Sequence, residues 1–131
     1  MKKARCSNYI EQGNVEYCGG YQYKGKEISI LNLYNGLGNG EGVLDFDEMF
    51  EQIRGTRIKK LIINVETTSK DFKIDSIGLG KIIGLLTSVN NQGGGVVFSN
   101  IHGRFAKILK TTKLNTIIPM YDSMKEALDS F

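Results

Sequence analysis

From residue 28 onward, short apolar runs alternate with segments of helical spacing. Residues 28–34 and 58–65 are apolar runs typical of strands, and three consecutive aliphatic residues in the second run indicate a strand inside a sheet. Between these runs, large hydrophobic residues recur on one helix face: Phe46, Met49, Phe50 and Ile53. This alternation is the feature that most restricts the fold, because strand–helix–strand units build layered α/β domains.

The alternation continues to the end of the chain. Helical spacing recurs at 79–89, 105–109 and 124–131, and strand-like runs occur at 96–98 and 116–121. Two pairs have the spacing of a helix-capping box, in which an Asp or Ser lies three residues before a Glu: Asp45 with Glu48 and Ser123 with Glu126. The pattern predicts an α/β fold with a mixed, mostly parallel sheet of four to five strands covered by about four helices.

The first 27 residues follow a different pattern. Residues 15–23 could form a strand that pairs with 28–34 across a turn at 24–26. We expect residues 1–14 to be a flexible N-terminal arm and residues 15–131 to be a single domain. Cys6 and Cys18 could pair, but because the chain starts without a secretory signal we expect reduced thiols and a cytoplasmic protein.

Composition excludes several classes of site. One His and two Cys in 131 residues leave no multi-His or Cys-rich metal site, and we expect no cofactor. A net charge of +3 is too small to indicate nucleic acid as a direct partner. No run approaches the roughly 20 apolar residues of a membrane span, so we expect no membrane insertion.

Glycine-rich segments and exposed cations have competing interpretations. The run 36–42 follows a strand and precedes a helix, but its spacing differs from a dinucleotide fingerprint, so a plain loop is favoured. Residues 78–81 lack the pattern of a phosphate loop. The isolated His102 is more often structural than catalytic. A basic row on the third helix favours a solvated face over a docking surface: Arg104, Lys107, Lys110 and Lys113.

The segment around Ser76 is the most informative. Ser76 follows Asp75 where the second long helix is expected to begin. A Ser there can cap free backbone N–H groups, and the same position suits a phosphate, because a helix N-terminus carries unpaired donors and a partial positive charge. The residues alone favour the cap and leave the phosphate interpretation open.

At this segment the chain resembles the STAS family, named for sulphate transporters and anti-sigma factor antagonists. The likeness rests on Asp75-Ser76-Ile77-Gly78-Leu79-Gly80, on the apolar helix through Val89, and on Gln92-Gly93-Gly94. It covers about residues 28–131. The sequence departs from the family at Ile77, which replaces a second Ser, at residues 36–39, which replace an acidic motif, and in a longer connection from Asn64 to Asp75.

The resemblance implies a partner-switching regulator of the anti-sigma factor antagonist type and not an enzyme. Ser76 would be phosphorylated by a serine kinase that is also the anti-sigma factor, and a PP2C-type phosphatase would reset it. The partner-binding residues would be Asp75, Ser76, Ile77, Gly78 and Leu79, with Gly36 and Asn39 adjacent. Two alternatives remain: a non-switching scaffold or small-ligand-binding STAS module, and an α/β enzyme that binds a nucleotide at the Gly-rich loop.

Overall fold

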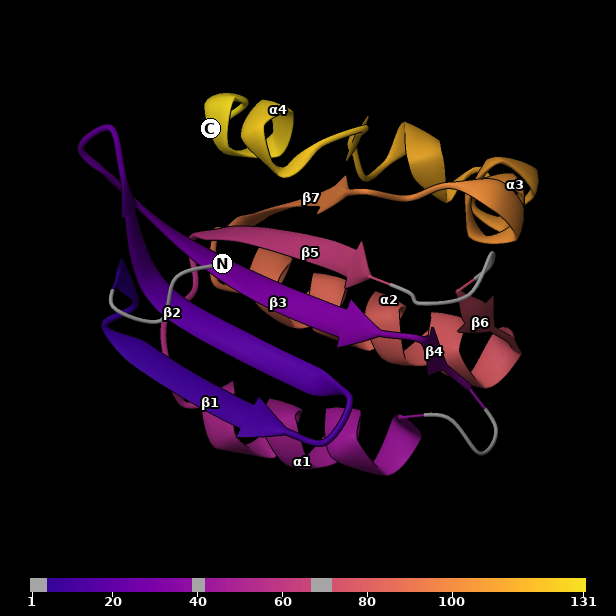
Figure 1. Ribbon diagram of the computed structural model, residues 1–131, viewed down its shortest axis with the longest axis horizontal. Coiled ribbons are helices and arrows are strands. Elements are labelled where there is room, and N and C mark those ends of the chain that lie inside the picture. Colours follow the sequence, from indigo (N-terminus) through magenta and orange to yellow (C-terminus); the bar gives the residue numbers. More distant parts are fainter. Residues whose placement is uncertain (1–4, 39–41, 67–71) are drawn as a thin grey trace.

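The structure, a computed structural model, describes residues 5–38, 42–66 and 72–131. A six-stranded sheet runs through its centre (Figure 1). In spatial order the strands are β1 (Asn8–Gln12), β2 (Val15–Tyr23), β3 (Lys26–Tyr34), β5 (Lys60–Glu66), β7 (Gly95–Ser99) and β8 (Met120–Tyr121). The first three strands pair antiparallel, and β3, β5, β7 and β8 pair parallel.

Helices cover both faces of this sheet, but unequally. They are α1 (Val43–Ile53), α2 (Ser76–Asn91), α3 (Gly103–Thr111) and α4 (Met124–Asp129). The helices α1 and α2 lie on one face and the short α4 on the other (Figure 1), while α3 adds Phe105 and Leu109 to the core on the α1/α2 side. A mixed, mostly parallel α/β sheet with four helices is confirmed, with six strands instead of the four to five expected.

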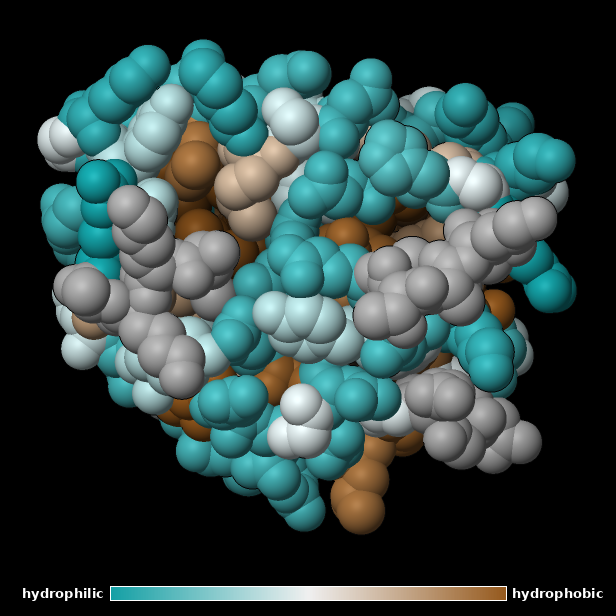
Figure 2. All heavy atoms as spheres, viewed as in Figure 1, coloured by the Kyte–Doolittle hydropathy of each residue, from teal (hydrophilic) through white to brown (hydrophobic). Residues whose placement is uncertain are grey.

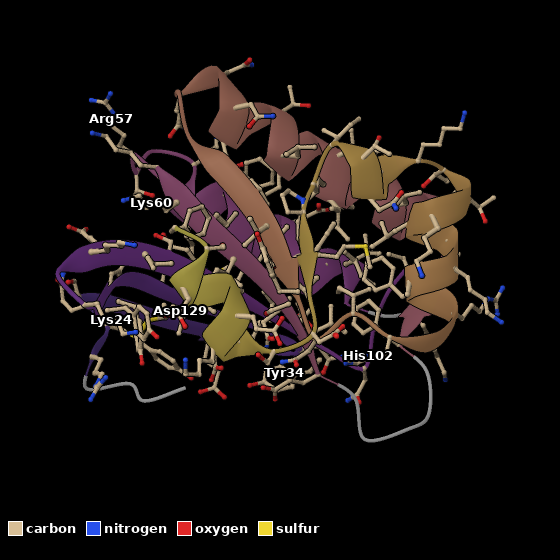
Figure 3. All side chains as sticks on the ribbon, turned by 90° about the horizontal axis from the view of Figure 1, so that it is seen from above. Lys24, Tyr34, Arg57, Lys60, His102 and Asp129 are labelled. Atoms are coloured by element: carbon tan, nitrogen blue, oxygen red, sulfur yellow. A yellow bond between two sulfur atoms is a disulfide. The ribbon has the colours of Figure 1, made fainter. Side chains whose placement is uncertain are left out.

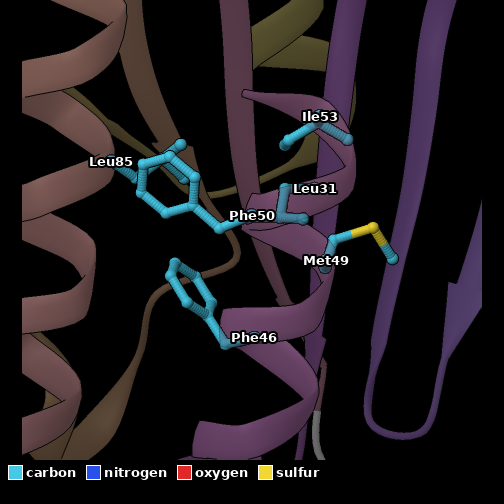
Figure 4. A pocket seen from close by; sticks show the side chains of 6 residues that line it. All are labelled: Leu31, Phe46, Met49, Phe50, Ile53 and Leu85. Atoms are coloured by element: carbon cyan, nitrogen blue, oxygen red, sulfur yellow. The ribbon is translucent and has the colours of Figure 1, made fainter. Parts of the chain in front are cut away.

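The larger core lies between the sheet and α1 and α2. Six hydrophobic side chains converge there from β3 and both helices (Figure 4): Leu31, Phe46, Met49, Phe50, Ile53 and Leu85. The crevice between them has no room for a water molecule. It is therefore close-packed core and not a ligand site.

A smaller core lies under α4. Ala127 and Leu128 of this helix pack over aliphatic residues of the neighbouring strands, such as Ile30 and Ile62. Helix α4 has six residues, and a cavity lies between it and residues near the ends of β3 and β5.

The N-terminal residues differ from the expected arm. Residues 8–12 form the edge strand β1, paired with β2 from Asn8 opposite Gly19 to Gln12 opposite Val15. This hairpin brings Cys6 to Cys18, and the two form a disulfide with their Cα atoms 5.2 Å apart. The expectation of reduced thiols is wrong in this structure, because the pairing of β1 with β2 brings the two cysteines within bonding distance.

The ends of two helices test the capping expectations. Helix α1 begins after Gly42, whose left-handed backbone (φ 69°) has no side chain to offer, and the Asp45 carboxylate instead accepts a hydrogen bond from the Asn14 N–H at 3.2 Å. The expected cap at Asp45 is therefore wrong. Ser123 does cap α4, accepting from the Glu126 N–H at 3.1 Å. Within the expected strand 116–121, only Met120–Tyr121 is extended.

Candidate partner-binding site at the start of α2

The first turn of α2 is held by Asp75. One oxygen of its carboxylate accepts hydrogen bonds from the backbone N–H groups of Ile77 and Gly78, both at 3.0 Å. Asp75 is thus the N-cap, and Ser76 is the first helical residue. The capping role expected for Ser76 belongs to its neighbour. The Ser76 side chain is exposed and makes no hydrogen bond with any residue that the structure describes.

A small second sheet packs against this first turn of α2. The strands β4 (Gly36–Leu37) and β6 (Lys73–Ile74) pair parallel, and β6 leads directly into Asp75. Gly78 lies so close to β4 that a Cβ there would be 1.7 Å from the Leu37 carbonyl oxygen. A Cβ at Gly38 would lie 2.7 Å from the Asp75 carboxylate. The Gly-rich segment therefore packs directly against the start of α2.

The structure brings most of the expected site residues together and exposes only some of them. Asp75, Ser76 and Ile77 are exposed, Gly78 is buried, and Leu79 is half-buried against the core. Gly36 lies buried in β4, beside the same turn. Asn39 lies outside the described residues.

Two exposed apolar side chains lie in the first turns of α1 and α2. Hydrophilic residues cover most of the face in Figure 2, so exposed large hydrophobic side chains are exceptions: Leu44, Ile77, Ile83 and Ile117. Ile77 is 48% exposed and Leu44, in the first turn of α1, is 71% exposed. Sequence reasoning missed Leu44, because helical spacing shows which residues share a face but not which face stays open.

An ion pair places these two residues at the same end of the molecule. Lys81 of α2 contacts Asp47 of α1 at 2.9 Å. Both helices connect parallel strands, so they run in the same direction. Leu44 and Ile77 lie about one turn before Asp47 and Lys81 respectively, so both flank the N-terminal ends of the paired helices.

The other candidate residues of the sequence form no second site. Arg104, Lys107 and Lys110 of α3 and Lys113 just after it are exposed, as expected for a solvated face. His102 is exposed at the start of α3, whereas Arg57 and Lys60 lie at the opposite end of the sheet (Figure 3). Among the described residues, no three His, Cys, Asp or Glu side chains gather to hold a metal ion. None of the described helices is long and apolar enough to cross a membrane.

The groups with shifted pKa values lie away from Ser76. Partial burial alone would raise the pKa of Glu16, but hydrogen bonds from Tyr9, Asn32 and Tyr34 outweigh this and lower it. Burial and the bond to Glu16 in turn raise the pKa of Tyr34. These groups join β1, β2 and β3, so their shifts reflect a structural network and not a reacting group.

Comparison with known proteins identifies the class. A profile described as the STAS domain matches residues 6–127, so this chain belongs to the STAS family. A Thermotoga neapolitana protein, named as a candidate anti-sigma factor antagonist, is 38% identical over 110 residues, which cover 83% of this chain and 95% of that protein. A candidate anti-sigma factor antagonist of Thermotoga maritima is 32% identical over 56 residues, 43% of this chain and 50% of that protein.

The fold comparison agrees with the family. A crystal structure of a candidate anti-sigma factor antagonist from Thermotoga maritima matches with a TM-score of 0.64 and 24% identity, over 77% of this chain and 86% of that chain. At that identity the likeness shows the fold alone. The resemblance to the anti-sigma factor antagonist branch is confirmed, and the names of these relatives describe regulators and not enzymes.

Proposed function

We propose that this chain is a partner-switching regulator, an antagonist that binds an anti-sigma factor and is controlled by phosphorylation of Ser76. The observation that carries the proposal is the exposed Ser76 hydroxyl at the start of a helix that Asp75 already caps. Because the fold does not use this hydroxyl, a kinase can modify it without dismantling the helix. The names of the relatives support an anti-sigma factor as the partner.

The unmodified surface suits a protein partner. Ile77, directly after Ser76, exposes an apolar side chain, and Leu44 exposes another at the same end of the paired helices; exposed apolar groups of this kind mark interaction surfaces when they gather. The contact residues would be Asp75, Ser76 and Ile77, with Gly78, Leu79 and Gly36 shaping the backbone around them. The departure at Ile77 then supplies an apolar contact where the family has a hydroxyl.

Phosphorylation would act on this surface by charge. A phosphate adds about −1.5 to −2 charges at neutral pH. The N–H groups of Ile77 and Gly78 already donate to Asp75, so the phosphate would remain beside a carboxylate at the partner surface. Like-charge contacts across an interface cost several kcal/mol, so we expect phosphorylation to weaken partner binding at least ten-fold. A PP2C-type phosphatase would restore binding.

The test uses a candidate serine kinase of the anti-sigma factor type. The protein is incubated with that kinase and ATP, and the phosphate is mapped by mass spectrometry. We expect one phosphate on Ser76, none in Ser76→Ala, and normal modification of Ser88→Ala, which changes a Ser in the same helix. A wild-type protein that binds the kinase but stays unmodified would contradict the switch.

Binding measurements separate the switch from the alternative of a non-switching scaffold or small-ligand module. The replacement of the family's acidic motif by residues 36–39 favours that alternative. A switch predicts that Ser76→Ala binds the anti-sigma factor and Ser76→Asp binds it weakly. Equal binding by the two variants would support the scaffold.

A cytoplasmic location belongs to the same proposal, because anti-sigma factors act on transcription. Cytoplasmic thiols are usually kept reduced. Mass spectrometry of protein trapped with an alkylating agent directly from cells therefore tests the location. Largely alkylated Cys6 and Cys18 would support it, and a stable disulfide would speak against it.

A further inference from the structure

A row of polar side chains crosses the α4 face of the sheet. Glu16, Asn32, Asn64 and Ser99 lie directly opposite one another on β2, β3, β5 and β7. They are joined by hydrogen bonds from Asn32 Nδ2 to Glu16 Oε1 at 2.9 Å, from Asn64 Nδ2 to Asn32 Oδ1 at 2.6 Å, and from Ser99 Oγ to Asn64 Oδ1 at 2.6 Å. On the three parallel strands the row lies near the carboxyl ends, which is where open α/β sheets bind ligands.

A cavity of about 110 Å³ opens between this row and α4. Asn32, Asn64, Glu66 and Asn100 form its polar side, and Tyr21 and Met124 lie on its apolar side. Its volume equals that of about four water molecules in the liquid. It can therefore hold the end group of a small molecule or of a side chain, but not a drug-sized ligand.

The hydrogen-bonding capacity of Asn64, at the centre of the row, is already used. Asn64 donates to Asn32 and to Glu66 at 3.3 Å, and its oxygen accepts from Ser99 and from Asn100 at 2.6 Å. The Glu66 carboxylate accepts only the Asn64 bond among the described residues, and Glu66 is exposed. This carboxylate is thus the charged group of the described lining that has acceptor capacity to spare.

The charges and the walls of the cavity specify the ligand. No Lys or Arg lines it, while Glu66 faces it and Glu16 lies behind Asn32. A cation is therefore favoured, and the single lining carboxylate beside apolar walls suits an organic cation better than a metal ion. The Tyr21 ring adds a surface on which an organic cation can lie. We propose that this cavity binds the alkylammonium or alkylguanidinium end of a small organic cation.

The test is an NMR titration of the full chain with n-propylammonium and with ethylguanidinium. n-Propanol, which has the same chain length without the charge, serves as the neutral probe. We expect both cations to shift the side-chain amide signals of Asn32, Asn64 and Asn100, and n-propanol to leave them unchanged. Equal shifts with n-propanol, or no shift with either cation, would overturn the proposal.

Two variants identify the residues responsible. Glu66→Gln keeps the shape and removes the charge, and hydrogen bonds to charged groups contribute enough that its affinity should fall about ten-fold or more. Glu27→Gln, an equally exposed carboxylate at the other end of β3, should bind like the wild type. Tyr21→Leu should weaken binding without abolishing it. Wild-type affinity in Glu66→Gln with an unchanged backbone spectrum would overturn the assignment.

A third probe distinguishes the source of the cation. N-acetyl-arginine amide presents the guanidinium as a protein side chain does. Binding of this probe together with ethylguanidinium would support entry of a partner's side chain. Binding of the free cations alone would support a free amine or guanidine as the ligand.

Discussion

Alanine substitutions at two glycines of α2 should change stability in opposite directions. Gly78 and Gly80 are both in the first two turns of the same helix. At Gly78 a Cβ would meet the Leu37 carbonyl oxygen at 1.7 Å, whereas at Gly80 nothing lies within 4 Å. We therefore expect Gly78→Ala to destabilise the protein relative to Gly80→Ala.

The size of the destabilisation by Gly78→Ala follows from the contact with the Leu37 carbonyl oxygen. Carbon–oxygen contacts in proteins settle at about 3.3–3.6 Å, so the new Cβ requires a displacement of roughly 1.5 Å or more. The atom it meets is backbone in β4 and cannot rotate away. Such overpacking costs about 1–3 kcal/mol. Replacing Gly by Ala in a helix gains about 0.5–1 kcal/mol at either position, so this gain cancels in the comparison.

Urea unfolding followed by circular dichroism measures both variants. We expect the free energy of unfolding of Gly80→Ala to rise by about 0.5–1 kcal/mol, and that of Gly78→Ala to lie about 1–3 kcal/mol lower than it, with an unchanged m-value. Gly84→Ala, also with open space around it, should behave like Gly80→Ala. If Gly78→Ala were as stable as Gly80→Ala, β4 would not support the start of α2.

Three further perturbations test the cap, an ion cluster and the disulfide. Asp75→Ala removes the N-cap and should lower the urea-unfolding free energy by about 1 kcal/mol, while Asp75→Asn should retain most of it. Hydrogen bonds from Tyr23, Lys125 and Lys24 lower the pKa of Asp129 well below its usual 3.8. The stabilising effect of the ionised carboxylate is therefore present above pH 3.8 and is lost as the pH falls further. In thermal melts between about pH 7 and 2, the higher melting temperature of the wild type relative to Asp129→Asn should decrease only in acid. Reducing the disulfide, whose cysteines are 12 residues apart, should lower the unfolding free energy by about 3 kcal/mol, and identical unfolding with and without reductant would refute this.

Local periodicity was sufficient to predict the elements that build the main core. The strand β5 and the helix α2 have continuous or helical apolar patterns, and both lie where expected. The strand β1 was not predictable in this way. It is an edge strand with only partly buried side chains, so its residues Asn8–Gln12 have no apolar run, and its register with β2 is a tertiary property.

The cavity on the α4 face was also hidden in the sequence. Asn32 and Asn64 each interrupt an apolar strand, and a polar residue inside such a run is a signal that something must satisfy it. The partners, however, come from neighbouring strands, 16 residues away for Glu16 and 32 for Asn64. Only the register of the whole sheet shows that these residues meet one another and surround a shared space.

The largest departure from the family has a physical explanation in the site itself. Gly38 lies in the segment that replaces the acidic motif, and a Cβ there would lie 2.7 Å from the Asp75 carboxylate that caps α2. A side chain at position 38 would therefore displace the cap or be displaced by it. In this chain, α2 thus packs closely against the Gly-rich segment, and the acidic motif that the family has at residues 36–39 is absent. On the proposed partner surface, binding would then depend on apolar contacts at Ile77 and Leu44, and we expect a matched partner to present apolar residues at that position instead of a basic cluster.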